Sequence, residues 1–198
     1  MPFYERSPYL YLKRLLDIFL SAILIVLLFI PMLILGAAIA ATSSGGAIFK
    51  QPRIGLNGEI FICYKFRTMY TNAPKNRPTA EFNDAEKYIT PIGRFLRKSS
   101  LDELPQLINV LRGDMSLVGP RPLIGEEAEL HYLRKRCGVY AMRPGITGLA
   151  QINGRDMLSG TEKVRLDVIY TKRPSLFSDA KIIFKTVGNT LSGNGITR

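Results

Sequence analysis

Two adjacent carboxylates, Asp102 and Glu103, stand in the most basic stretch of this chain. Carboxylate oxygens bind hard divalent cations such as Mg²⁺, and guanidinium groups bind phosphate oxygens in pairs. A carboxylate that is withdrawn from water could also attack phosphorus. These residue types at this spacing are therefore suited to binding a nucleotide diphosphate. The cations around the pair are Arg94, Arg97, Lys98, Arg112 and Arg121.

The same acid pair also has a purely structural interpretation. Ser100 and Glu103 have the Ser-x-x-Glu spacing of a capping box, and Asp102 is itself a good N-cap residue. On spacing alone, a plain helix start is the simpler interpretation. The arginine cluster argues against it, because a cap needs one carboxylate and no cations. A helix N-terminus would also favour ionised Asp102, which is the nucleophilic form.

The composition indicates one compact domain with an appendage and an anionic partner. The chain has 198 residues, with 27 basic against 16 acidic side chains and a formal charge of +11. This excess predicts a phosphorylated ligand, an anionic lipid or nucleic acid, and does not choose among them. The two cysteines, Cys63 and Cys137, have neither disulfide nor zinc spacing, which fits a reducing compartment. With His131 as the single histidine, Ser-His-Asp chemistry is not favoured.

An apolar run from Leu15 to Ala41 contains one charged residue, Asp17, near its start. It exceeds the roughly 18 apolar residues that indicate membrane insertion, and it is longer than the apolar core of a cleaved signal peptide. Basic residues flank both ends, so the positive-inside bias does not orient the segment. Pro31, after Ile30, should bend or break the helix. A kinked transmembrane helix and a re-entrant hairpin both stay open from the residues alone.

The rest of the sequence predicts an α+β fold, in which a mostly helical domain carries a small β-hairpin. A polar linker at 42–46 separates a membrane-anchoring segment, residues 1–46, from this second domain, residues 47–198. Strands are expected over 48–53 and 59–66, joined at Asn57-Gly58, which is a strong hairpin signal. Residues 71–87 are expected to form a loop with a short acidic segment, and residues 143–148 a rigid, turn-rich loop. Helices are expected over 89–98, 103–111, 126–137, 161–172 and 178–191.

Three ordered motifs resemble the bacterial sugar transferase family, and within it the monotopic polyprenyl-phosphate phosphoglycosyl transferases. The motifs are KFRTM at Lys65–Met69, LRKSSLDELPQLINVLRGDMSLVGPRP at Leu96–Pro122 and RPGITGLAQINGR at Arg143–Arg155. The likeness covers nearly the whole chain, and the length resembles the minimal form of the family. Three motifs in one order make the resemblance highly specific.

The resemblance implies a reaction. Such enzymes transfer a sugar 1-phosphate from a nucleotide sugar, usually a UDP-sugar, to undecaprenyl phosphate and release UMP, which starts the assembly of surface polysaccharides or glycoproteins. By this resemblance Asp102 is the nucleophile of a ping-pong scheme with a covalent aspartyl phosphosugar intermediate, and Glu103 helps to place Mg²⁺, the expected cofactor. The residues predicted to bind substrate are Lys65, Arg67, Arg97, Pro120, Arg121, Pro122, Gln151 and Arg155.

The resemblance also favours a re-entrant helix-break-helix over a spanning helix. One substrate dissolves in the cytosol and the other keeps an isoprenoid tail in lipid, so the expected location is the cytoplasmic face of the bacterial inner membrane. The family typically bends at Ser-Pro, whereas this chain has Ile30-Pro31, and the hydroxyl that could satisfy freed backbone groups is missing. The expected partners are a UDP-sugar, a polyprenyl phosphate and membrane lipid, with no nucleic acid; a homodimer stays open.

Two alternatives without catalysis stay open beside the enzyme. A membrane-anchored basic domain that binds anionic lipid or nucleic acid would explain the charge and the apolar run, but not the acids in the most basic stretch. A structural subunit of a glycan-assembly complex would use Asp102 and Glu103 only as a helix cap. Magnesium-dependent release of UMP separates the first alternative from the enzyme. Asp102→Asn separates the second, because asparagine caps a helix as well as aspartate and should leave a structural role intact. No residue indicates which sugar is transferred.

Overall fold

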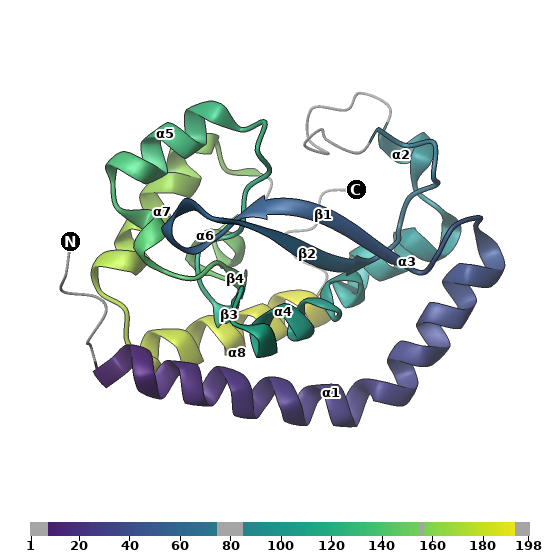
Figure 1. The fold of residues 1–198 in the computed structure, drawn as a ribbon, viewed down its shortest axis with the longest axis horizontal. Coiled ribbons are helices and arrows are strands. Elements are labelled where there is room, and N and C mark those ends of the chain that lie inside the picture. The colour runs from purple at the N-terminus through teal and green to yellow at the C-terminus, as the bar shows by residue number, and fades with distance from the viewer. Residues whose placement is uncertain (1–7, 75–84, 155–156, 193–198) are drawn as a thin grey trace.

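A computed structural model describes residues 8–74, 85–154 and 157–192. A long helix, α1 (Pro8–Thr42), follows one edge of the molecule, and the other elements lie on the concave side of its bend (Figure 1). The strands are β1 (Ile48–Ile54), β2 (Ile60–Phe66), β3 (Ser116–Val118) and β4 (Gly145–Thr147). The later helices are α2 (Ala85–Tyr88), α3 (Pro91–Ser99), α4 (Gln106–Arg112), α5 (Ala128–Arg136), α6 (Leu149–Ile152), α7 (Gly160–Lys172) and α8 (Leu176–Ser192).

Helix α1 is one continuous helix, so the structure does not show the predicted helix-break-helix at Ile30-Pro31. Pro31 lies inside the helix, and the ribbon bends instead of breaking (Figure 1). A proline removes one backbone hydrogen bond and clashes with the preceding turn, and a bend relieves that clash while the flanking hydrogen bonds survive. The segment therefore remains a helix along its whole length.

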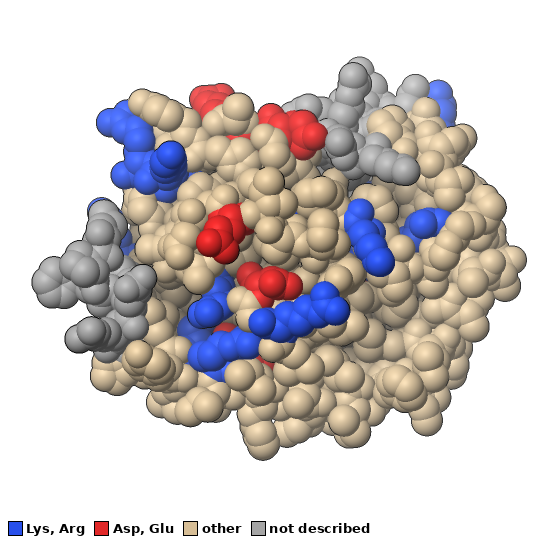
Figure 2. Space-filling model, in the orientation of Figure 1, with Lys and Arg blue, Asp and Glu red and all other residues tan. Residues whose placement is uncertain are grey.

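The apolar surface of α1 faces away from the domain. The helix is long and apolar enough to cross a membrane, and only 6% of its most apolar 18-residue window is buried. The core helix of a soluble protein would bury most of such a window. The lower margin of the molecule, where α1 runs, carries no charged side chain on the face shown in Figure 2. This exposed apolar surface indicates a membrane-associated protein.

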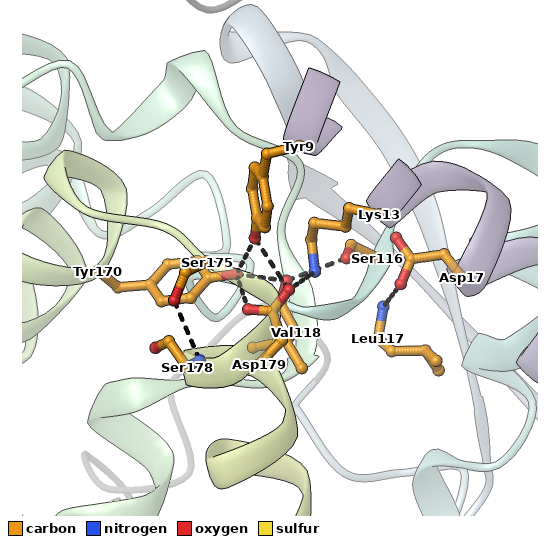
Figure 3. Close-up of polar contacts among 10 residues, drawn as sticks. All are labelled: Tyr9, Lys13, Asp17, Ser116, Leu117, Val118, Tyr170, Ser175, Ser178 and Asp179. Carbon is orange, nitrogen blue, oxygen red and sulfur yellow. Dashed lines mark hydrogen bonds and ion pairs between the residues drawn. The ribbon is translucent and has the colours of Figure 1, made fainter. Parts of the chain in front are cut away.

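Buried hydrogen bonds and an ion pair hold the first turns of α1 against the domain (Figure 3). Lys13 Nζ lies 2.8 Å from Asp179 Oδ2 of α8. The hydroxyl groups of Tyr9 and Tyr170 donate to the same carboxylate at 2.8 and 2.7 Å. Asp17, the one charge of the apolar run, is turned inward and accepts from a β3 backbone amide at 3.1 Å. The polar residues that begin α1 therefore serve its attachment to the domain.

The predicted hairpin is confirmed. Strands β1 and β2 pair antiparallel from Ile48↔Phe66 to Ile54↔Ile60. The connection contains Asn57 and Gly58 with φ of 55° and 80°, the left-handed conformations that this residue pair adopts at low cost. Strands β3 and β4 were not predicted, because each has three residues and they pair in parallel across a long stretch of chain. Residues 145–147, expected as part of a rigid loop, form β4.

The predicted helices are present, with changed boundaries. The helix expected over 103–111 begins only at residue 106, and residues 101–103 form a 3-10 turn before it. In the segment expected to be a loop, residues 85–88 form α2, and residues 75–84 lie outside the described part of the chain. The predicted boundary at residue 46 falls between α1 and β1 and stays a prediction.

Two buried apolar clusters fix β2 against the helices that flank the acid pair. One joins α1 and α3 to the end of β2, and the other joins α4 to its middle. The two clusters consist of Ile39, Phe66 and Leu96, and of Cys63, Val110 and Met115. Burial of such side chains contributes about 1.5–3 kcal/mol each, so the strand and its two helices form a firm frame.

Glycines allow β3 and β4 to approach closely just before residue 120. A Cβ atom on Gly145 would lie 2.0 Å from the backbone nitrogen of Gly119. Backbone cannot move aside as a flexible side chain can, so we expect Gly145→Ala to lower the free energy of unfolding by about 2–3 kcal/mol. Gly125→Ala is the matched control, because nothing lies within 4 Å of its added carbon. Thermal unfolding of both variants tests this, and equal midpoints would contradict it.

Candidate active site

The acid pair lies in a 3-10 turn, Leu101–Glu103, between α3 and α4. Ser100 precedes it with φ of 55°, which is a left-handed conformation. Neither this turn nor α4 has a side-chain cap hydrogen bond at its start. The capping-box interpretation of Ser100 and Glu103 therefore finds no support in the structure, and the two carboxylates are left for another role.

Two cations from distant segments meet at Glu103. Lys65 Nζ of β2 lies 2.7 Å from Glu103 Oε1, and Arg121 Nη1, beyond β3, lies 3.2 Å from the same oxygen. The side chains of Lys65 and Glu103 are 18% and 15% exposed, whereas that of Arg121 is 46% exposed. The fold thus brings together three of the residues singled out in the sequence, and much of the Arg121 side chain still faces solvent.

Asp102 has a different environment from its neighbour. Within the described residues, no hydrogen bond or ion pair holds its carboxylate. Burial raises the pKa of Asp102, and Glu103 adds to the rise, while Lys65, Arg97 and Arg121 oppose it. This direction differs from the one expected for a helix N-terminus, because α4 begins after the acid pair and burial has the largest influence.

A small recess adjoins the Lys65–Glu103 pair. Arg53 of β1 is largely buried in it, and burial lowers the pKa of this guanidinium, with Arg121 adding to the effect. The sequence does not single out Arg53 or Gln106 as site residues, because basic residues on a hairpin are usually solvated and Gln106 resembles any polar helix residue. The recess is lined by Arg53, Cys63, Lys65, Gln106, Arg121 and Pro122.

Asn109 fixes the distance between β2 and the acid pair, and sequence reasoning missed it as well. Its side chain is completely buried and accepts from the Tyr64 backbone amide at 3.0 Å. It also donates to the Ile62 carbonyl at 2.7 Å and to Asp114 Oδ2 at 3.0 Å. A polar residue in the middle of a short apolar helix was the available signal. Asn109 therefore sets the register between Lys65 and the turn that carries Glu103.

Arg97 and Arg67 occupy different surroundings. Arg97 lies in the last turn of α3 and donates from Nε to Thr68 Oγ1 at 3.0 Å. Its charge acts on the Asp102 carboxyl. Arg67 Nη1 instead donates to the Ser44 carbonyl at 3.1 Å, in the linker after α1. The structure therefore places Arg97 beside the acid pair and Arg67 against the linker.

The structure places Gln151 in α6 and not among the contacts of the acid pair. Gln151 is buried in α6, where its amide nitrogen lies 3.4 Å from the Ile146 carbonyl. Its Oε1 atom has no partner within the described residues. This position fits the support of a loop. Arg155 lies outside the described part of the chain.

The donor set at the acid pair fits magnesium better than a transition metal. Among the described residues, no group of three or more His, Cys, Asp and Glu side chains gathers around one point. Mg²⁺ is commonly held by one or two carboxylates together with substrate phosphates, so Asp102 and Glu103 meet its needs only when a phosphorylated ligand completes the shell.

Comparison with known proteins identifies the family of this chain. The sequence model of the family described as bacterial sugar transferase matches residues 8–193. An uncharacterised sugar transferase, EpsL, of Bacillus subtilis is 42% identical over 185 residues, which cover 93% of this chain and 90% of the relative.

Two further relatives have names that state a reaction. UDP-glucose:undecaprenyl-phosphate glucose-1-phosphate transferase of Caulobacter vibrioides is 43% identical, over 91% of this chain and 70% of the relative. Undecaprenyl-phosphate galactose phosphotransferase of Salmonella typhimurium is 40% identical, over 93% of this chain but only 41% of the relative. The chain thus spans most of some relatives and about two fifths of others. With its sequence matched almost from end to end, this chain belongs to the bacterial sugar transferase family.

Proposed function

We propose that this protein transfers a sugar 1-phosphate from a UDP-sugar to undecaprenyl phosphate, giving undecaprenyl-diphosphate-sugar and UMP. The names of the relatives support the reaction class. The observation that carries the proposal is the contrast within the acid pair. Lys65 and Arg121 neutralise Glu103, while no hydrogen bond or ion pair among the described residues engages the adjacent Asp102 carboxylate.

The contrast suits covalent catalysis in two steps. An oxygen of Asp102 attacks the phosphorus that carries the sugar, the bond from that phosphorus to the UMP oxygen breaks, and an aspartyl phosphosugar forms. A phosphate oxygen of the polyprenyl acceptor then attacks the same phosphorus, and the Asp102 carboxylate leaves. Each step makes one P–O bond and breaks another, so the scheme is ping-pong and the aspartate is regenerated.

The cations of the site lower the barrier to this attack. An anionic nucleophile approaching an anionic phosphorus is repelled, and fixed positive groups offset that repulsion. Lys65, Arg97 and Arg121 are the cations whose charges act on Asp102. Mg²⁺, held by Asp102 and Glu103, would supply further charge neutralisation on the diphosphate. The recess beside Lys65 is shallow and open to solvent, so it accommodates only part of the donor.

The attachment of α1 supports a re-entrant segment at the cytoplasmic face of the inner membrane. Lys13, near its start, and Ile39, near its end, are both buried against the same domain. A 35-residue helix is about 52 Å long, and a spanning helix would carry one end across a bilayer core of about 30 Å, away from the domain. The bend of α1 instead lets both ends stay on one side while the exposed apolar middle enters the lipid (Figure 1).

A panel of UDP-sugars with undecaprenyl phosphate tests the proposed function. We expect Mg²⁺-dependent release of UMP with one donor or a few, equimolar formation of the lipid-linked diphosphosugar, and loss of both on addition of EDTA. Restoring Mg²⁺ should restore both products, because the chelator removes the metal and leaves the protein folded. No UMP from any donor, or full activity in EDTA, would contradict the reaction or its metal dependence respectively.

A further inference from the structure

The turn at residues 120–122, which presents Arg121 to Glu103, is held by three donors from three elements. Its first carbonyl accepts from the backbone nitrogen of Gly145 at 2.9 Å. The second accepts from Arg134 Nη1 at 2.7 Å, and the third from Arg53 Nη1 at 2.9 Å. Pro120 and Pro122 have no N–H groups, so the turn offers few donors of its own, and its position depends on donors supplied by other segments.

Arg134 reaches this turn from within the domain as half of a buried ion pair. It lies on α5, is 3% exposed, and its Nη2 atom lies 2.5 Å from Asp167 Oδ2 of α7. Arg134 Nε and Asp167 Oδ1 are buried without partners among the described residues. Apolar residues of similar volume often stabilise a protein more than a buried ion pair does. A contribution to stability therefore does not explain why a guanidinium group is buried at this position.

The geometry gives a better account. We propose that Arg134, oriented by Asp167, is a positioning residue that holds the 120–122 turn and so keeps the Arg121 guanidinium beside Glu103. The planar guanidinium suits this role, because its two Nη atoms reach two acceptors on different elements at once. Arg134 does not touch the acid pair in this arrangement and acts only through Arg121. The catalytic consequence rests on the proposed function, whereas the mechanical one does not.

The mechanical part is tested by hydrogen exchange. The Gly145 amide donates to the Pro120 carbonyl at 2.9 Å, so its exchange rate, followed in overlapping peptides, reports on how firmly the turn is held. We expect Arg134→Met to speed this exchange by about 10-fold or more, and Arg136→Met, the same change at an exposed position of α5, to leave it unchanged. Unchanged exchange in Arg134→Met would overturn the proposal whatever the protein catalyses.

The catalytic part is tested by a double-mutant cycle with Arg121→Ala, scored as UMP release. In the wild-type background we expect Arg134→Met to lower kcat/KM by about 10- to 100-fold, because a misplaced binding group is costly in the transition state. In the Arg121→Ala background the same change should cost less than about 3-fold. An equal loss in both backgrounds would mean that Arg134 is merely structural. If wild-type protein releases no UMP, the proposed function fails and the exchange result is unaffected.

Arg134→Lys keeps the test valid if Arg134→Met does not fold. The lysine ammonium still pairs with Asp167, but as a point charge it does not replace a fork that reaches two acceptors. We expect the melting temperature of Arg134→Lys to lie close to that of wild type, while exchange of the Gly145 amide is as fast as in Arg134→Met and turnover is as low. Full recovery of slow exchange and turnover in Arg134→Lys would show that charge alone suffices and would overturn the positioning role.

Discussion

Asp102→Asn is expected to abolish UMP release while leaving the protein folded and at least as stable as wild type near neutral pH. The amide lacks the anionic oxygen that attacks phosphorus, so turnover should fall by three orders of magnitude or more, on the order of the loss when a catalytic nucleophile is removed. The side chain keeps its size, and within the described residues no hydrogen bond or ion pair of the carboxylate is lost. A helix cap would give the opposite result, because asparagine caps as well as aspartate.

The stability part of this expectation follows from the raised pKa of Asp102, which burial causes. A carboxyl whose pKa is higher in the folded state binds its proton more tightly there than in the unfolded chain. Its contribution to stability is therefore present at low pH and is lost as the pH rises from the unfolded pKa through the folded one. The asparagine variant lacks that loss, so its advantage in thermal unfolding should grow as the pH rises.

Mass spectrometry of protein mixed with the donor alone completes the test. Wild type should gain the mass of a sugar phosphate on the peptide that contains Asp102, and the asparagine variant should not. The donor-only activity of wild type should fall on the acid side of the raised pKa, since the protonated carboxyl is not a nucleophile. Continued turnover in the asparagine variant, or an adduct on another residue, would remove Asp102 from this role.

The sequence could predict the parts of the site that lie close together along the chain. The acid pair, Arg97 and Arg121 fall within one motif, and the hairpin that carries Lys65 was indicated by Asn57-Gly58. Each of these signals is local. A turn needs residues that adopt a particular backbone conformation, and a motif consists of residues at fixed distances along the chain. The meeting of Lys65 and Arg121 at one oxygen of Glu103 depends on the tertiary fold, and no local pattern contains it.

The parts that could not be predicted act through buried polar contacts between distant segments. Arg53, Arg134 and Asp167 resemble ordinary surface residues in the sequence, and all three are largely or fully buried. Composition and periodicity indicate which faces are apolar. They do not reveal which polar side chain will be buried against a hydrogen-bonding or charged partner from another segment. Strands β3 and β4 were missed for a related reason, since three-residue parallel strands have no measurable alternation.

Breaking the buried ion pair between Lys13 and Asp179 is expected to destabilise the protein strongly. The two side chains are 8% and 9% exposed, so removing one partner leaves the other charge buried (Figure 3). We expect Asp179→Asn to lower the free energy of unfolding by about 3–5 kcal/mol. Lys13→Met should cost less, because the hydroxyl groups of Tyr9 and Tyr170 still donate to the remaining carboxylate.

The double variant shows whether the loss of stability comes from an unpaired buried charge or from the change of side chain itself. Lys13→Met combined with Asp179→Asn removes both charges and keeps an acceptor for the tyrosine hydroxyl groups, so its stability should return to within about 1 kcal/mol of wild type. Lys135→Met, at an exposed position, should change stability by less than about 0.5 kcal/mol. Unfolding in detergent or nanodiscs measures all four variants. Additive losses in the double variant would mean that each residue stabilises the protein independently of the other.

The contact between Lys13 and Asp179 also affects the acid pair, because the start of α1 touches α4. Arg14 Nη1 and Nη2 donate to the carbonyls of Val110 and Leu111, at 2.6 and 3.0 Å, at the end of α4. Two residues separate the acid pair from α4, so a shift of α1 against α4 should be transmitted to the catalytic candidates through one short helix. We therefore expect Asp179→Asn to lower UMP release more strongly with a membrane-embedded acceptor than with a short-chain soluble one. Equal losses of UMP release with both acceptors would mean that the Lys13–Asp179 pair contributes only to folding.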